Sequence, residues 1–459
     1  MRPINTSVFD LFKIGPGPSS SHTIGPMLAA NNFLELLRES PPPLLAQARG
    51  LRVLLYGSLS RTGRGHGTVR AVLAGRLGHK PETCSALTLD GIDLRPAARF
   101  SVRAGKIVLA VTPADIVFTT EKKGARFPAR RFPFSNTLLI QLLGDAGKVL
   151  LEREYYSVGG GFIEWKGFRP EPRGRPKYPY ATALQLRAQL QRHHLSLHAL
   201  VLENEQAVTG LEPERIRERL DATLDAMAAS VKRGIVTEGF LPGPIHLHRK
   251  GALLFQRAQK MGRSPERFLV YLSAYAFAAA EENAAGHTIV TAPTCGSAGV
   301  MPAVLHFLRH HKDVPLAALR NALLSSAAIG FIIRHGASIS GAEVGCQGEI
   351  GVASAMAAAF LAGAHDQPFV IMENAAETAL EHHLGMTCDP VRGYVQIPCI
   401  ERNAMGAVKA YTAYTIACGG IPEWHIVGLD NAVKAMAMTG RDMSCSYKET
   451  ALGGLAKSC

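Results

Sequence analysis

Hydrophobic and polar positions follow two different patterns along this chain. Between about residues 52 and 156, short apolar runs alternate with Gly, Pro and Asp, as in RVLLYGS, KIVLAV, LLIQLL and KVLLEREYY. Short apolar runs bounded by turn residues predict β-strands, and the periodicity of residues 68–77 predicts a helix between them. The pattern therefore predicts an α/β (α+β) domain over residues 1–163.

A proline-rich segment follows this predicted domain. WKGFRPEPRGRPKYPY contains Pro170, Pro172, Pro176 and Pro179. Proline at that density continues neither a helix nor a central strand, so residues 164–180 predict a linker. Beyond Ala181 the pattern is helical nearly to the end, and residues 181–459 predict an all-α domain.

Two stretches of the helical part differ in character. Pro213 and Glu214 open an amphipathic helix, ERIRERLDATLDAMAASVKRG, with Glu early and Lys-Arg late, as the helix dipole prefers. Residues 350–364 are small and apolar, but they fall short of the roughly 18 to 20 residues that span a bilayer. They predict a buried helix. The first residues contain no apolar signal region, so we expect a cytoplasmic protein without a membrane partner.

Composition narrows the classes of protein further. With about 150 residues per domain, 459 residues suggest two or three domains, and 47% hydrophobic with 19% charged residues exclude global disorder. The net charge is +13, but the basic residues are scattered and aromatic residues make up only 7%. This pattern indicates a basic surface that attracts small carboxylates, with no nucleic-acid partner.

The cysteines supply the first candidate chemistry. Eight cysteines in a large cytosolic chain do not predict disulfides. Cys346, Cys388 and Cys399 stand in GCQGE, MTCDP and IPCIERN, and the chain ends on Cys459. Three thiolates with a replaceable fourth ligand are typical of a reactive cubane cluster, although the spacing alone does not exclude zinc. The other cysteines are Cys84, Cys295, Cys418 and Cys445, and each is expected to be a small buried side chain. A further role is left open only for Cys295.

Two loops offer further candidate groups. GPGPSSSHTIGPM places His22 among four hydroxyl side chains, which suit a carboxylate or phosphate but also suit a capped helix start. In SRTGRGHGT, glycines flank His66 on a predicted strand-to-helix loop, so this imidazole is a candidate general base, or a structural histidine. With the glycines of YYSVGGGF, the candidate substrate contacts are Ser19, Ser20, Ser21, Thr23, Gly65, Gly67, Thr68, Gly159 and Gly160.

Together these segments resemble one family, the iron–sulfur L-serine dehydratases (L-serine ammonia-lyases) of the bacterial single-chain form. The resemblance covers essentially the whole chain, through SVFDLFKIGPGPSSSHTIGPM, TGRGHGT, YYSVGGGF, TAPTCGSAGVMPAVL, ISGAEVGCQGEIGVA, ETALEHHLGMTCDPVRGYVQIPCIERNAMGAVKA and YKETALGGLAKSC. It implies an N-terminal domain like the allosteric substrate-binding domain of some phosphoglycerate dehydrogenases, an all-helical C-terminal domain and a homodimer. It also implies a [4Fe-4S] cluster on Cys346, Cys388 and Cys399, with Cys459 capping the fourth iron.

Two positions depart from the family pattern. Cys295 stands where the family usually has asparagine, so no role is transferred to it. Arg392 stands where glycine is usual, and we expect only a changed loop there.

The chemistry expected from this resemblance is a lyase reaction that converts L-serine to pyruvate and ammonia. The cluster would act as a Lewis acid on the hydroxyl, and His66 would take the α-proton, with His22 as the other candidate base or as its support. The triple-serine loop would hold the substrate, and the site should lie between the domains. The C-terminal tail resembles serine with sulfur in place of oxygen, so it would be a displaceable cap.

Two alternatives remain at this point. One is a serine/threonine dehydratase that uses pyridoxal phosphate, with Lys13 as the Schiff-base lysine and the triple glycine as a phosphate loop. The other is a non-catalytic iron–sulfur redox sensor. The sequence does not determine the preference among L-serine, L-threonine and L-cysteine, nor whether serine activates at a second site.

Overall fold

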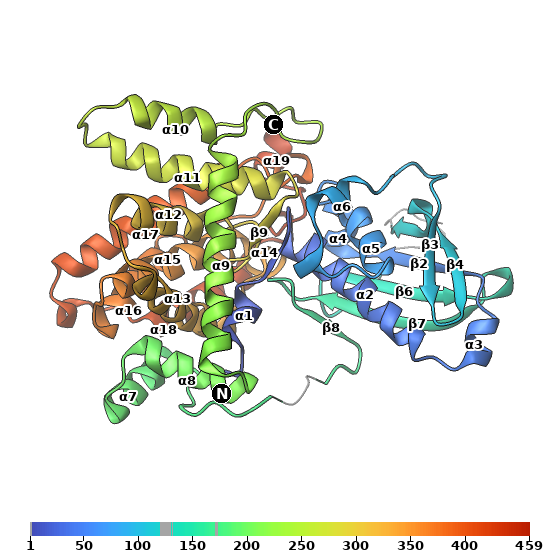
Figure 1. Cartoon of the computed structure of the whole chain (residues 1–459), viewed down its shortest axis with the longest axis horizontal. Coiled ribbons are helices and arrows are strands. Elements are labelled where there is room, and N and C mark those ends of the chain that lie inside the picture. Colours follow the sequence, from blue (N-terminus) through green and yellow to red (C-terminus); the bar gives the residue numbers. More distant parts are fainter. Residues whose placement is uncertain (1, 120–129, 131, 170–172) are drawn as a thin grey trace.

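The computed structural model describes residues 2–119, 130, 132–169 and 173–459. A part built on a mixed sheet and a part built of helices meet along a junction, on the right and left of Figure 1. This confirms the predicted α/β N-terminal region and helical C-terminal part. Pro170 and Pro172 of the predicted linker lie outside the described residues, and residues 173–180 form neither helix nor strand.

The N-terminal sheet has five strands in the order β5-β2-β6-β7-β8. β2 pairs in parallel with β5, and the other neighbours are antiparallel. Beside it, β3 and β4 form a separate hairpin. The predicted strands are confirmed, and the bounds are β2 (Gly50–Leu55), β3 (Phe100–Ala104), β4 (Ile107–Val111), β5 (Ile116–Phe118), β6 (Thr137–Leu143), β7 (Val149–Ser157) and β8 (Ile163–Trp165).

Helices α2 (Gly25–Arg38) and α5 (Thr68–Arg76) pack against each other and share one apolar core with the sheet. The helix expected at residues 68–77 is thus confirmed. The short helices of this part are α3 (Pro42–Ala46), α4 (Gly57–Thr62) and α6 (Ala86–Asp90). Because α4 forms directly after β2, His66 lies in a turn between two helices. The prediction that His66 lies in a strand-to-helix loop is therefore wrong.

The helical part surrounds one central helix, α15, which is packed against α13, α16 and α17. Apolar residues cover all sides of α15, as expected for a buried helix, so this prediction is confirmed. The helices of this part are α7 (Ala183–His193), α8 (Leu197–Thr209), α9 (Pro213–Gly234), α10 (Gly251–Lys260), α11 (Glu266–Ala284), α12 (Val300–His311), α13 (Leu316–Gly336), α14 (Gly341–Val344), α15 (Ile350–Ala364), α16 (Phe369–Glu381), α17 (Cys399–Gly419), α18 (Leu429–Asp442) and α19 (Leu455–Ser458).

The amphipathic helix predicted from Pro213 is α9, which begins at that residue. Its buried positions recur at helical spacing, with Ile216, Leu220, Leu224 and Met227 facing the core. By length and composition α13 could span a membrane, as could α14 and α15 as one bent pair. However, 72% of the apolar window of α13 is buried inside the protein, as in the core helix of a helical bundle.

The N-terminal segment connects the two parts. α1 (Val8–Leu11) packs into the core of the helical part, where Val8 and Leu11 are fully buried. β1 (Ile14–Pro16) then pairs antiparallel with β9 (Thr288–Val290), a strand inside the helical region. The chain continues into η1 (Ser20–Ile24) and α2 of the sheet part. The triple-serine loop is therefore held at the junction, an arrangement that local periodicity did not predict.

Candidate active site at the junction of the two parts

Two buried histidines from different elements face each other at the junction. His22 comes from η1 and His66 from the turn between α4 and α5, and their rings stack with centroids 4.4 Å apart. His66 Nδ1 lies 2.8 Å from the carbonyl oxygen of Thr62. Because a carbonyl oxygen only accepts hydrogen bonds, Nδ1 carries the proton and Nε2 keeps its lone pair. His66 is thus held in the tautomer that a general base requires.

His22 is held on both of its ring nitrogens. Nδ1 lies 2.8 Å from Ser21 Oγ, and Nε2 lies 2.9 Å from Thr62 Oγ1 and 3.2 Å from Ser58 Oγ. Burial lowers the pKa of both rings, and it lowers that of His66 to about 4. Both are therefore neutral near pH 7. His66 lines the pocket described below and His22 does not, so His66 is better placed to act as the base.

Hydroxyl groups lock these two loops together. Thr23 Oγ1 donates to the His66 carbonyl at 2.7 Å, and Thr68 Oγ1 donates to the His22 carbonyl at 2.7 Å. Ser19 Oγ accepts from the backbone N–H of His22 and also lines the pocket. Ser19 therefore caps a helical turn, as one of the two interpretations of this loop expected, and the binding of a carboxylate or phosphate stays a prediction.

The three internal cysteines converge on one pocket. Cys346 lies in the short turn η5 (Gly345–Gly348), Cys388 follows α16, and Cys399 begins α17. All three are buried and none forms a disulfide. The pocket that they line also contains Ser19 and His66 of the sheet part. The structure therefore brings together the predicted cysteines, the candidate base and one predicted substrate contact.

This pocket fits an iron–sulfur cluster by its donor set. Contact with Cys346 together with burial raises the pKa of Cys388, and burial raises the pKa of Cys399, so both thiols are protonated until a metal displaces the proton. Gly341 lies against the cysteines, and a Cβ there would come within 3.3 Å of Cys388 Sγ. Three buried thiols that line one pocket are the ligands that iron–sulfur clusters use.

Arg402 supplies positive charge beside the cysteines. Its guanidinium donates to the carbonyl of Thr387 at 2.6 Å and to Asp389 Oδ1 at 3.1 Å. Burial opposes the charged form of Arg402, but the neighbouring Cys346 and Cys399, together with Asp389, outweigh it and raise the pKa of the guanidinium. This cation would stabilise the negative charge of thiolate ligands.

Two glutamates complete the pocket, and the residue-by-residue sequence reasoning missed both. Glu349 Oε2 lies 3.9 Å from the sulfurs of Cys346 and Cys388, while its Oε1 accepts from Thr294 at 2.8 Å. Burial and the nearby Glu449 carboxylate raise the pKa of Glu349 to about 7. The only signal in the sequence was its place three residues after the cysteine in GCQGE.

Glu449 belongs to the C-terminal segment and lies between the histidines and the cysteines. Its backbone N–H donates to the Cys388 carbonyl at 2.8 Å, which draws the segment to the pocket. Oε1 lies 3.5 Å from His22 Nδ1 and 3.8 Å from His66 Nε2, while Oε2 is buried without a hydrogen-bond partner. Burial raises the pKa of Glu449 to about 8. No local pattern distinguishes this glutamate in YKETALGG.

Several predicted contacts lie outside the cysteine pocket. Cys459 is exposed, and its backbone N–H closes the last turn of α19. Ser20 is buried but does not line the pocket, and Thr68 supports His22. Gly159 packs against Ser340, and Gly160 turns its carbonyl to Lys13. Gly65 and Gly67 line a neighbouring cavity of about 280 Å³.

Burial was expected for the remaining four cysteines, and a changed loop was expected at Arg392. Cys84 and Cys295 are buried as expected, and burial raises the pKa of Cys295. Cys418 and Cys445 are exposed, so their predicted burial is wrong: Cys418 lies in the last turn of α17, and Cys445 begins the short turn η8 (Cys445–Tyr447). Arg392 has a φ of 52°, the left-handed region that favours glycine, which accounts for the glycine usual there.

Comparison with known proteins agrees with this geometry. Residues 192–456 match the serine dehydratase alpha chain and residues 7–167 match the serine dehydratase beta chain. The L-serine dehydratase of Streptomyces coelicolor is 43% identical over 98% of both chains. L-serine dehydratase 2 of Escherichia coli K12 is 41% identical over 98% of both chains, and the Mycobacterium tuberculosis L-serine dehydratase is 41% identical over 98% of this chain and 97% of its own. The chain therefore belongs to the serine dehydratase family and unites its beta-chain and alpha-chain regions in one polypeptide.

Proposed function

We propose that this protein is a lyase that deaminates L-serine to pyruvate and ammonia. The observation that carries the proposal is the shared pocket of three buried cysteines and His66 at the junction. The relatives named L-serine dehydratase, matched along the whole chain, support the same reaction. A pocket that needs groups from both parts is suited to a substrate that enters between them.

Cys346, Cys388 and Cys399 would hold a [4Fe-4S] cluster, which supplies a Lewis acid for the substrate hydroxyl when it is bound. Arg402 would balance the negative charge of the thiolates. Gly341 and Gly296 keep the pocket free of further side-chain atoms, since a Cβ at either would approach Glu349 within 3.0 Å.

His66 would remove the α-proton of L-serine through Nε2. The Thr62 carbonyl fixes the tautomer, and burial keeps the ring neutral near pH 7. Ser19 and the neighbouring Ser21 would bind the substrate carboxylate or amine, because both hydroxyls lie beside the stacked histidines. Loss of water leaves aminoacrylate, which tautomerises to the imine and hydrolyses to pyruvate and ammonia.

The C-terminal tail would control access to this pocket. Glu449 stands between His66 and the cysteines, so the segment that carries it must shift before a substrate can reach both groups. The ten residues after Glu449 could span about 33 Å when extended, enough for Cys459 to enter the pocket vacated by that shift. Cys459, with its thiol and carboxylate, would then be a displaceable cap in the place of the substrate.

The test is an anaerobic assay of the purified full-length protein. We expect pyruvate from L-serine together with iron and acid-labile sulfide in the same sample. A pyridoxyl-lysine adduct after borohydride, without iron, would instead support the pyridoxal phosphate alternative. Iron and sulfide without any pyruvate would support the redox sensor. L-Threonine and L-cysteine, assayed alongside, would determine the substrate preference.

The cap is tested with Cys459→Ala and, as a matched control, Cys445→Ala, which alters another exposed cysteine. We expect Cys459→Ala alone to reach full activity faster and to lose activity faster in air, because the cap no longer competes with substrate or shields the cluster. Unchanged onset and unchanged air sensitivity would show that the tail stays outside the pocket.

The homodimer and the likeness to an allosteric substrate-binding domain stay predictions. Light scattering of the purified protein tests the homodimer.

A further inference from the structure

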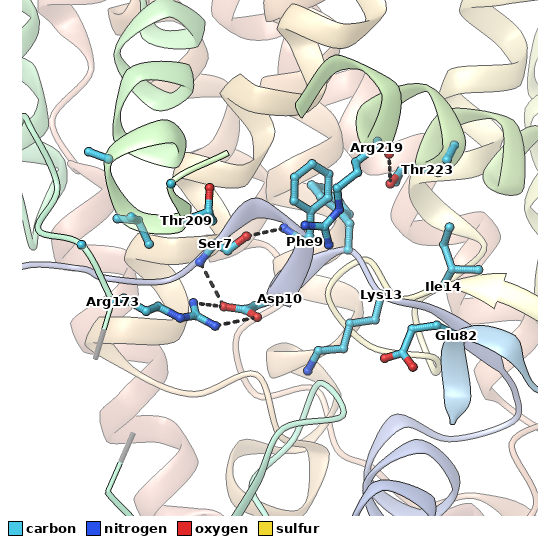
Figure 2. A pocket seen from close by; sticks show the side chains of 16 residues that line it. Ser7, Phe9, Asp10, Lys13, Ile14, Glu82, Arg173, Thr209, Arg219 and Thr223 are labelled. Atoms are coloured by element: carbon cyan, nitrogen blue, oxygen red, sulfur yellow. Dashed lines mark hydrogen bonds and ion pairs between the residues drawn. The ribbon is translucent and has the colours of Figure 1, made fainter. Parts of the chain in front are cut away.

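A second cavity lies away from the cysteines, against the N-terminal segment (Figure 2). It is bounded by α1, the start of β1, the segment at Arg173 and helices α8 and α9. Its volume of about 780 Å³ falls in the range of small-molecule sites, roughly 300 to 1,000 Å³. Its charged lining residues are Asp10, Lys13, Glu82, Arg173 and Arg219.

The two cations of the lining other than Lys13 differ in their contacts. Arg173 forms an ion pair with Asp10, which also accepts from the backbone N–H of Ser7 at 3.0 Å. The Arg219 guanidinium lies 3.8 Å from the centre of the Phe9 ring, in cation–π geometry. Asp10 therefore makes its ion pair with Arg173 and not with Lys13.

Lys13 makes no ion pair within the described part of the chain, although the charges of Asp10 and Glu82 act on it. Its Nζ donates to the Gly160 carbonyl at 3.1 Å and lies 3.5 Å from the centre of the Phe162 ring. The Arg334 guanidinium carbon lies 4.0 Å from the centre of the same ring, so two cations contact one aromatic side chain. Figure 2 shows Lys13 between Asp10 and Glu82 with no ion pair drawn to either. Within the described part of the chain, no carboxylate pairs with Lys13 or Arg334.

Burial and the neighbouring Arg334 lower the pKa of Lys13 to about 7, although Asp10 and Glu82 act in the opposite direction. An anion beside the ammonium group would reverse much of this loss, because an opposite charge favours the charged form. The same physical situation, a cation in a cavity without its own carboxylate, favours binding of a negatively charged ligand.

We propose that this cavity binds a small carboxylate, whose negative charge pairs with the Lys13 ammonium group. With Lys13 protonated, the lining holds three cations and two carboxylates, so one positive charge remains for a monoanion to balance. A dianion such as phosphate is disfavoured, because Asp10 and Glu82 would repel its second charge. The apolar side chains of Phe9, Phe12 and Ile14 suit the organic part of such a ligand.

The proposed site is connected to the serine loop through strand β1. Lys13 directly precedes β1, and its backbone exchanges hydrogen bonds with Thr291, each 2.9 Å long. β1 then leads into Ser19 and η1. The proposed site is nevertheless separate from the cysteine pocket, and the proposal does not depend on the proposed reaction.

The experiment titrates the full-length protein with [1-¹³C]acetate and follows line broadening by NMR, which measures binding without any turnover. We expect Lys13→Met to weaken acetate binding roughly 10- to 100-fold, the value of a charge-assisted hydrogen bond. Lys13→Arg, which keeps the charge, should retain most of the affinity. Lys148→Met, which removes an exposed lysine of the sheet part, should leave it unchanged.

Two further variants keep the test decisive even if Lys13→Met fails to fold. Glu82→Gln removes a repelling carboxylate from an exposed position, so acetate should bind more tightly, a gain that loss of structure would not produce. Ser19→Ala should leave this binding intact. The proposal is overturned if the wild-type protein binds no acetate, if Lys13→Met or Glu82→Gln leaves the affinity unchanged, or if Ser19→Ala abolishes it.

Discussion

Replacing His66 by asparagine removes the candidate base while leaving a side chain of similar polarity. The hydrogen bond of 2.8 Å from Nδ1 to the Thr62 carbonyl leaves only Nε2 to accept a proton, and Nε2 belongs to a ring that is 1% exposed. His22 cannot readily replace it, because hydroxyl groups surround both of its nitrogens. We therefore expect the α-proton to lose the imidazole acceptor that this pocket supplies.

The magnitude follows from the role of a positioned base. General base catalysis contributes roughly 10²- to 10⁴-fold, which is about 2.7 to 5.4 kcal/mol of the barrier. We expect kcat/KM of His66→Asn to fall by that factor, with the iron content unchanged.

The His66 pKa of about 4 also has a consequence for the wild-type protein. A base works only when deprotonated, so the loss of kcat/KM due to His66 should come as pH falls toward about 4 and not near 6.5.

The assay is anaerobic pyruvate release, with iron analysis and the thermal midpoint measured on the same preparation. His382→Asn is the matched control, because His382 Nδ1 makes the same 2.8 Å contact with a carbonyl four residues earlier but is exposed. It should keep wild-type activity. Wild-type kcat/KM in His66→Asn, with the control also unaffected, would refute the assignment of His66 as the base.

Three other predictions follow from the cluster pocket and from the core. Cys388→Ser should lose most of the iron measured per chain, whereas Cys418→Ser should retain it, and equal iron contents would contradict the ligand assignment. Prolonged exposure to air should abolish pyruvate release and bleach the visible absorption together; activity that survives bleaching would exclude a catalytic cluster. Glu282→Gln should destabilise the fold by about 3 to 5 kcal/mol in urea unfolding, since it leaves the buried Arg249 without its carboxylate, and Glu218→Gln, on the surface, should change stability little.

Glu282 also predicts a pH dependence of stability. Its hydrogen bonds and ion pairs outweigh burial and lower its pKa to about 2. A carboxylate with a lower pKa in the folded state stabilises the protein above its usual value of 4.5, and this contribution is lost as pH falls from there toward 2. The acid-induced loss of stability in this window should be smaller in Glu282→Gln, as measured by urea unfolding at each pH.

Local patterns were sufficient to predict most of the helices and strands. The strands around LLIQLL and KVLLEREYY, the amphipathic α9 and the apolar α15 were all predictable, because each depends on periodicity within one segment. The short helix α4 was not, and its presence moved His66 to a turn between two helices. Family resemblance supplied the cysteine set, which the structure then brought to a single pocket.

The sequence by itself determined the two-part architecture and most of the candidate site residues, since these depend on residue type and near neighbours. Only the tertiary structure decided which of them meet. The pairing of β1 with β9, the placement of Glu449 beside Cys388 and the exclusion of Gly159 and Gly160 all join residues far apart in the chain. The difference between His22 and His66 likewise depends on contacts with Thr62, Ser58 and Glu449. Such contacts form only when the whole chain packs, so no local pattern contains them.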